Sequence, residues 1–338
     1  ATAPVETQTP LVSTFNEWDP LEEIVVGIVE DALIPPWETV SPAVIHDKRQ
    51  WQFFRANGGK PWPAEMLRKA QADIEAFVHI LEAEGVTVRR PERFAWDRPL
   101  STPAWASPSS LYALMPRDVL LVVGDLIIEA PMAWRSRYFE HHAYKRLCKE
   151  YFRAGARWIS APRPELSEDS YVPGFVAPEE GETQRYILTD HEPLFDAADA
   201  IKCGRDLFVG RSSCCNSFGI DWLRRELAPD FRVHEVEVYD THPMHIDATF
   251  YPLAPGKLLV HPTRCARVPE MFERSGWEIL TCPAPNMPAD HPMYNCSPWI
   301  SMNVVMLDHE RVIVSKGEED LIRAFKRWGF TPIECPFY

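Results

Sequence analysis

Residues 119–129, VLLVVGDLIIE, hold two short apolar runs on either side of a Gly-Asp pair. Short runs rich in Val, Ile and Leu are typical of buried β-strands. Helical character follows at 137–153, and Gly155 after it is a residue type that commonly ends a helix. A third short run with apolar residues lies at 157–159. This part of the chain therefore predicts one strand–strand–helix–strand unit.

The same order of elements recurs along the rest of the chain. Upstream, an apolar run at 24–26 precedes a predicted helix at 63–84, where apolar residues return every three or four positions, and a short strand at 86–88. Downstream, three further copies are expected at residues 200–238, 257–281 and 303–334. A unit of this kind buries its apolar face only against its neighbours. Five such units therefore favour a closed cyclic array.

The periodicity alone would also fit an open doubly wound α/β sheet of the Rossmann type. The sequence contains neither G-x-G-x-x-G nor G-x-x-x-x-G-K-[ST], so the main support for a nucleotide-binding fold is missing. The length of 338 residues fits one large domain or two ordinary ones. We expect a flexible arm at residues 1–15, a single domain over 16–338, and a long loop rich in Pro and Trp at 32–63.

The composition excludes several classes of partner. The net charge of −14 argues against nucleic acid, since phosphate binding depends on clustered Lys and Arg. The apolar runs are far shorter than the roughly 20 residues that a membrane helix needs, so we expect no membrane span. The eight cysteines lack paired C-x-x-C spacing, which argues against structural zinc and is typical of reduced thiols in a cytoplasmic protein.

Three short segments place ionisable residues beside predicted strands, where a buried charge is costly unless it has a function. They are MPRD at 115–118, EPLFDAAD at 192–199 and PMHIDATF at 243–250. In the last segment His245 and Asp247 alternate, so an extended backbone would point both side chains to the same face. The three segments are therefore candidates for a functional site.

Each segment also has a purely structural interpretation. Asp118 could lead a strand out of a turn, and Asp196 and Asp199 could cap a helical turn. His245 and Asp247 could form a satisfied surface pair. Taken together, however, several carboxylates and a histidine suit a guanidinium group, which offers five in-plane donors. A nearby carboxylate would also raise the pKa of the histidine and keep it able to donate a proton, so the set indicates an arginine substrate.

Seven colinear stretches of the chain resemble the glycine amidinotransferase family. They are NEWDPLEE at 16–23, VTVRRP at 86–91, MPRD at 115–118, IEAPMAWR at 128–135, FDAAD at 195–199, PMHIDATF at 243–250 and SMNV at 301–304. The resemblance implies a five-bladed α/β propeller of strand–strand–helix–strand modules, with the active site at the end of a narrow central channel. This fold agrees with the five units that the sequence predicts.

The resemblance also implies a reaction. In this family a cysteine attacks the guanidinium carbon of L-arginine, ornithine leaves, and the amidino-cysteine passes its group to an acceptor amine, with neither a metal nor an organic cofactor. Asp196 and His245 match the acid–base pair of the family. His245 would protonate the departing ornithine and later deprotonate the acceptor, as ping-pong chemistry requires.

The same resemblance suggests which residues bind the substrate. Asp118 and Asp247 would hold the guanidinium group, and Arg264 matches the residue that binds the substrate carboxylate. Cys296 and Ser297 fall where family members carry a pair of small polar residues, and the cysteine departs from the serine expected there. The thiol would give a weaker hydrogen bond to an amino acid.

His242 and Met244 lie at positions that differ among family members with different acceptors. The histidine at 242 would indicate either a different acceptor amine or only a different residue in the lining of the site. The acceptor amine itself stays open between glycine, lysine and a precursor of a secondary metabolite.

The nucleophilic cysteine of the family lies in a Gly-rich segment that ends in His-Cys, which the resemblance places beyond Tyr338. We expect that segment either as part of a longer protein or as truly absent. Cys335 is one alternative nucleophile. Cys214 and Cys215 are another, because nearby Arg211 could lower a thiol pKa. For all three cysteines we favour packing as the role.

Three functions remain open from the sequence. The first is an amidinotransferase that takes L-arginine and an acceptor amine, expected as a cytoplasmic homodimer. The second is hydrolysis of arginine to citrulline, as in the related deiminases. The third is an arginine-binding protein without catalysis. Product analysis with and without an amine separates the first two.

Overall fold

The computed structural model describes residues 11–45, 47–286 and 297–337, and within them four three-stranded sheets repeat one strand pattern. In each sheet the middle strand pairs antiparallel with the strand before it and parallel with the strand after it. A helix connects the two parallel strands, because a parallel pair needs a crossover connection. The predicted strand–strand–helix–strand unit is therefore confirmed four times.

The four units have the following elements. They are β5 (Leu120–Val123), β6 (Leu126–Glu129), α5 (Lys145–Arg153) and β7 (Arg157–Ser160); β8 (Ala200–Cys203), β9 (Asp206–Gly210), α6 (Ser217–Glu226) and β10 (Arg232–Val236); β11 (Phe250–Ala254), β12 (Lys257–Val260), α7 (Glu270–Arg274) and β13 (Glu278–Thr281); and β14 (Val305–Met306), β15 (Arg311–Ser315), α8 (Glu319–Arg327) and β16 (Thr331–Cys335).

The remaining unit comes first in the chain and is shorter than expected. It contains β1 (Glu23–Val25), α3 (Ala64–Ala83) and β2 (Thr87–Arg89). β1 pairs in parallel with β2, and their sheet has two strands in the described part of the chain. Within residues 11–45, 47–286 and 297–337 this unit therefore keeps the helix and the parallel pair, without a leading antiparallel strand.

The segment before β1 forms backbone bridges to two other units. Thr14 forms an antiparallel bridge with Gly124, between β5 and β6, and Asn16 forms one with Cys203 of β8. Residues 11–15, which we expected within a flexible arm, therefore belong to the folded unit and help to hold neighbouring units together.

The helices end and pack as the sequence pattern predicts. α3 buries Ile74, Val78 and Leu81, which recur at intervals of four and three residues on one helix face. Gly155 follows α5 with φ 101°, and Gly329 follows α8 with φ 88°. This left-handed conformation is costly for a residue with a Cβ atom, so glycine suits the turn from helix to strand.

Two stretches differ from their predictions. The expected long loop at 32–63 contains short helical segments, namely α1 (Ser41–Val44), η1 (Lys48–Gln50) and α2 (Trp51–Asn57). The predicted helix at 137–153 is regular only over α5, since η2 (Arg135–Arg137) and η3 (Glu140–Tyr144) form 3₁₀ turns before it. A buried ion pair between Arg137 and Glu140 accompanies these turns and directs both charges into the protein.

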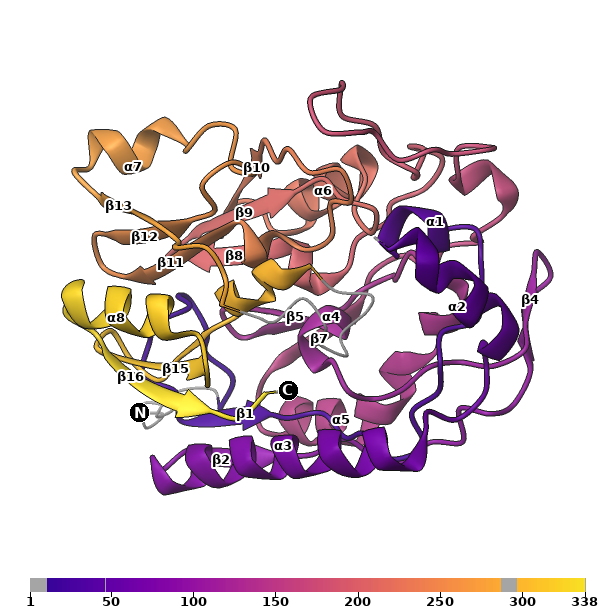
Figure 1. Cartoon of the computed structure of the whole chain (residues 1–338), viewed down its shortest axis with the longest axis horizontal. Coiled ribbons are helices and arrows are strands. Elements are labelled where there is room, and N and C mark those ends of the chain that lie inside the picture. Colours follow the sequence, from indigo (N-terminus) through magenta and orange to yellow (C-terminus); the bar gives the residue numbers. More distant parts are fainter. Residues whose placement is uncertain (1–10, 46, 287–296, 338) are drawn as a thin grey trace, which may run out of the picture.

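The longer helices and the short turns lie in different parts of the molecule. Figure 1 shows α3, α7 and α8 at the rim, with α4 (Pro116–Val119) towards the middle. Three more short segments resemble α4 in lying just before the first strand of a unit, namely η5 (Ala197–Asp199), η6 (Ile246–Ala248) and η7 (Pro298–Met302). α4 contacts η5, η5 contacts η6, and η6 contacts η7. The repeated fold thus brings four equivalent turns together.

Candidate active site

The four turns bring together the carboxylates and the histidine that the sequence singled out. Asp118 lies in α4. Asp196 comes just before η5, and Asp199 is the last residue of η5. His245 comes just before η6, and Asp247 lies within it. The four aspartates are 8% exposed or less. A buried carboxylate needs a charged or hydrogen-bonding partner, so such a cluster demands a specific arrangement.

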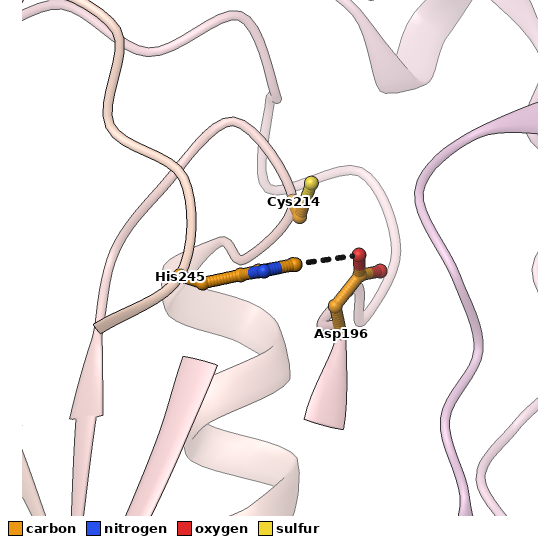
Figure 2. Close-up of side chains that lie close together, drawn as sticks. All are labelled: Asp196, Cys214 and His245. Atoms are coloured by element: carbon orange, nitrogen blue, oxygen red, sulfur yellow. Dashed lines mark hydrogen bonds and ion pairs between the residues drawn. The ribbon is translucent and has the colours of Figure 1, made fainter. Parts of the chain in front are cut away.

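His245 is the link between two of these turns. Its Nε2 atom lies 3.1 Å from Oδ2 of Asp196, which forms a hydrogen bond, and its Nδ1 atom lies 3.8 Å from Oδ1 of Asp118. Figure 2 shows the imidazole directed at the Asp196 carboxylate. The side chain of His245 is 12% exposed, so both contacts form largely out of water.

The backbone at His245 is strained. Its φ is 57°, which is unfavourable for a residue with a Cβ atom, and η6 begins immediately after it. The expectation that an extended strand places His245 and Asp247 on one face is therefore wrong. Both residues still reach the centre, because the 3₁₀ turn points Asp247 towards Arg117 while His245 turns towards Asp196.

The electrostatics of the cluster keep His245 protonated. Burial lowers the pKa of His245, but Asp118, Asp196 and Asp199 favour the imidazolium and raise the pKa to about 10. Burial also raises the pKa of Asp199 to about 7, against the opposing charge of His245. The site therefore presents an acid at neutral pH beside one carboxyl group, that of Asp199, with a pKa near neutrality.

Arg137 also belongs to the cluster, since it contacts both Asp118 and Asp196. This residue was missed by the sequence analysis. It is 1% exposed, and its Nη1 atom lies 2.9 Å from Oδ2 of Asp118 and 3.4 Å from Oδ2 of Asp196. Its Nη2 atom lies 2.9 Å from Oε2 of Glu140. The one sequence signal was the pair of opposite charges at positions 137 and 140 within a run of aromatic residues. That pattern is equally common on a helix surface.

Three carboxylate oxygens of the four aspartates have no hydrogen-bond partner among the described residues. They are the buried Oδ1 atoms of Asp196, Asp199 and Asp247. The other oxygen of Asp247 lies 3.6 Å from Nε of Arg117. An unpaired buried acceptor is unfavourable, so these oxygens suit a ligand that brings N–H donors.

Arg264 and Ser297, which the resemblance assigns to substrate binding, lie side by side in the structure. Nη2 of Arg264 donates to Oγ of Ser297 at 2.8 Å, and Nε lies 2.8 Å from Oδ2 of Asp240. His242 and Met244 share the loop between β10 and β11 with Asp240 and the site histidine. Cys296 lies outside the described residues.

The alternative nucleophiles do not have the properties of reactive thiols. Cys214 and Cys215 are fully buried, and burial raises the pKa of both well above the usual value. Cys335 is buried in β16, and burial raises its pKa to about 12. A protonated, buried thiol is a poor nucleophile, which supports the packing role that we favour for all three.

In the ranges that the structure covers, no helix combines the length and the apolar character needed to cross a membrane. This agrees with the expectation from the short apolar runs of the sequence.

Comparison with known proteins gives the family. No protein-family model matches the chain. The L-arginine:L-lysine amidinotransferase of Pseudomonas savastanoi pv. phaseolicola is 50% identical over 330 residues, which cover 98% of this chain and 90% of that protein. The mitochondrial glycine amidinotransferase of Danio rerio is 44% identical over 329 residues, covering 96% of this chain and 78% of that protein.

A solved structure agrees with these relatives. The amidinotransferase of the saxitoxin biosynthetic pathway from Microseira wollei superposes with a TM-score of 0.92 at 45% identity, over 96% of this chain and 92% of that one. The five-bladed α/β propeller expected from the sequence is therefore confirmed, and the chain belongs to the amidinotransferase family.

Proposed function

We propose that this protein transfers the amidino group of L-arginine to an acceptor amine through an amidino-cysteine intermediate and releases ornithine. One observation carries the proposal: His245 lies between two buried carboxylates, beside carboxylate oxygens that lack donors in the described structure. Such a site suits a guanidinium group, a planar cation whose departing nitrogen must be protonated when its C–N bond breaks.

The carboxylates would bind the guanidinium group. Asp247 and Asp196 each offer a buried oxygen without a partner in the described residues, and Asp118 lies on the other side of His245. Paired N–H donors of a guanidinium match carboxylate oxygens well and form charge-assisted hydrogen bonds. Binding would satisfy acceptors that are unfavourable in the free protein.

The proton transfers would run through His245. In the first half-reaction a cysteine thiolate forms the C–S bond, the C–N bond to ornithine breaks, and the imidazolium donates its proton to the departing nitrogen. In the second half-reaction the acceptor amine forms a C–N bond, the neutral imidazole accepts its proton, and the thiolate leaves. The raised pKa of His245 supports the first role, because it keeps the proton available at neutral pH.

Arg137 would act as a positioning residue. Its guanidinium contacts Oδ2 of Asp118 and Oδ2 of Asp196, while Oδ1 of Asp196 stays without a partner in the described residues, and Glu140 balances its charge. An arginine holds two carboxylates in fixed relative positions because its donors are planar and rigid. We therefore propose that it orients Asp196 towards His245 without contacting the substrate.

The substrate carboxylate would bind at Arg264 and Ser297. The guanidinium of Arg264 is 14% exposed and is oriented by Asp240 through Nε, while Nη2 reaches Ser297. Cys296 would complete this part of the site, and His242 and Met244 would border the acceptor. Because the two relatives named above use lysine or glycine, we propose a primary amine of an amino acid or of a secondary metabolite as acceptor.

Some wider properties are proposed by resemblance to the family. We propose a homodimer, with a cytoplasmic location that fits seven free cysteines in the described residues. We also propose one domain from residue 16 onwards, with residues 11–15 joined to it as described. Light scattering of the purified protein tests the dimer, and limited proteolysis that releases a stable fragment within residues 16–338 would contradict the single domain.

Product analysis tests the proposed reaction. The full protein is incubated with L-arginine alone, with glycine and with lysine, and ornithine, citrulline and the guanidino product are quantified. With an amine we expect ornithine and guanidino product in equal amounts over many turnovers, and with L-arginine alone no more than one ornithine per active site. Citrulline formed at the same rate with and without an amine would support hydrolysis, which family membership does not favour.

A further inference from the structure

A third side chain with metal-binding chemistry meets the His245–Asp196 pair. Cys214 lies in the loop between β9 and α6, and one ligand atom from each of Asp196, Cys214 and His245 lies within 4.8 Å of the other two. Figure 2 shows the Cys214 sulfur on the same side of the Asp196 carboxylate as the imidazole. The proposed reaction makes no use of this thiol.

The spacing is close to that of a tetrahedral metal site. Zinc–ligand distances of about 2.0 Å to nitrogen or oxygen and about 2.3 Å to sulfur place neighbouring ligand atoms about 3.3–3.5 Å apart. His245 Nε2 and Asp196 Oδ2 are 3.1 Å apart, so the imidazole and the carboxylate already lie at about this spacing. The Cys214 thiol is the third group within 4.8 Å, and water would take the fourth position around an ion.

A second observation favours a ligand at this place. Asp196 is fully buried, and its Oδ1 atom has no hydrogen-bond partner in the described ranges. Arg137 lies 3.4 Å from the other oxygen, Oδ2, so its positive charge is on one side of the carboxylate only. Asp118 and Asp199 add negative charge around His245. The cluster can therefore receive a cation at Oδ1.

We propose that Asp196, Cys214 and His245 bind a divalent cation of the zinc class when arginine is absent, and that the ion inhibits the enzyme in competition with arginine. A thiolate, an imidazole and a carboxylate together select zinc or cobalt over magnesium, which prefers oxygen ligands. The inhibition rests on the proposed acid–base function of the pair, whereas the binding does not.

The test uses the full protein, reduced and free of metal, with Co²⁺ and Zn²⁺ as probes and Mg²⁺ as the negative control. We expect one Co²⁺ per chain with a thiolate-to-cobalt charge-transfer band, and Zn²⁺ inhibition that excess arginine relieves. Cys214→Ala should weaken Zn²⁺ binding by at least ~100-fold, because it removes a direct ligand. Transfer without metal should stay within a few-fold of wild type.

Cys215→Ala is the matched control, because that neighbouring thiol is equally buried and is not part of the three-residue cluster. It should keep wild-type metal binding. Cys214→Ser, which preserves side-chain size, repeats the test if Cys214→Ala does not fold. Unchanged Zn²⁺ affinity in the Cys214 variants, or a cobalt complex without the charge-transfer band, overturns the site. Metal binding in a protein that transfers no amidino group would instead contradict the proposed function alone.

Discussion

Replacing Arg137 with methionine tests the positioning role that we propose for this residue. The change keeps a long apolar side chain and removes a charge that is 1% exposed and bonded to Asp118, Asp196 and Glu140. Three carboxyl groups are then left around an uncharged side chain. Removing one partner of a buried ion pair costs about 3–5 kcal/mol of folding free energy. The melting temperature should fall by roughly 4–7 °C for a chain of 338 residues.

The catalytic effect should exceed what lost stability explains. Asp196 Oδ2 accepts from both Arg137 and His245, so losing one donor frees the carboxylate to rotate away from the imidazole. A misplacement of about 1 Å lowers rates by ~100-fold. We therefore expect kcat about 100-fold lower at a temperature where the variant is fully folded, with KM for arginine changed by less than ~10-fold. Arg137→Lys, which keeps the charge, should be intermediate.

Steady-state kinetics and thermal unfolding measure these effects together. Arg163→Met is the control, because Arg163 also pairs with a buried carboxylate, at 3.0 Å from Glu129, and is not bonded to the site carboxylates. It should lower stability and leave kcat within ~3-fold. If Arg137→Met also kept kcat within ~3-fold while losing stability, Arg137 would have a structural role only, and the positioning argument would be refuted.

Four further predictions follow from the same structure. His245→Asn should lower kcat by at least ~1,000-fold with an unchanged circular dichroism spectrum, because it removes the proton donor; wild-type turnover in this variant would exclude the mechanism. Asp247→Asn should raise KM for arginine by ~10- to 100-fold and change kcat little, since a charge-assisted hydrogen bond contributes about 1.5–3 kcal/mol, and kinetics showing the reverse split would contradict that role. The pKa of His245, raised from 6.5 to about 10, should add stability that is complete below pH 6.5 and is lost as the pH rises towards 10, which urea unfolding of wild type and His245→Asn can compare. Leu81→Ala should cost about 2–5 kcal/mol in unfolding experiments without affecting kcat, because Leu81 is fully buried on the inner face of α3 and remote in sequence from every site residue.

The sequence predicts most of the repeated architecture because the strands are short, apolar and regularly followed by helix and glycine. The run VLLVVGDLIIE becomes β5 and β6 as expected. The first unit could not be predicted in full, because tertiary contacts decide where the segment before β1 pairs. The backbone at Thr14 and Asn16 bridges to other units. Likewise, helical periodicity at 137–144 is overridden by the buried ion pair of Arg137 and Glu140.

The site shows the same division. Asp118, Asp196 and His245 stand out in the sequence because each lies just before an apolar strand, and the repeated fold brings those positions together. Arg137 and Cys214 carry no such mark. Their places beside Asp196 depend on how a 3₁₀ turn and a loop from different parts of the chain pack around the centre. Only the three-dimensional arrangement identifies them.

The most direct test of the account follows the amidino group itself. The full protein is mixed with arginine labelled at the guanidinium carbon, quenched in acid at short times, and examined for label on protein, with lysine or glycine added in a second mixing step. We expect wild type to take up one labelled amidino group per active site, released to the amine as guanidino product, and His245→Asn to take up label at least ~1,000-fold more slowly. Product formed without labelled protein, or equal labelling of His245→Asn, would contradict the covalent mechanism with His245 as its acid.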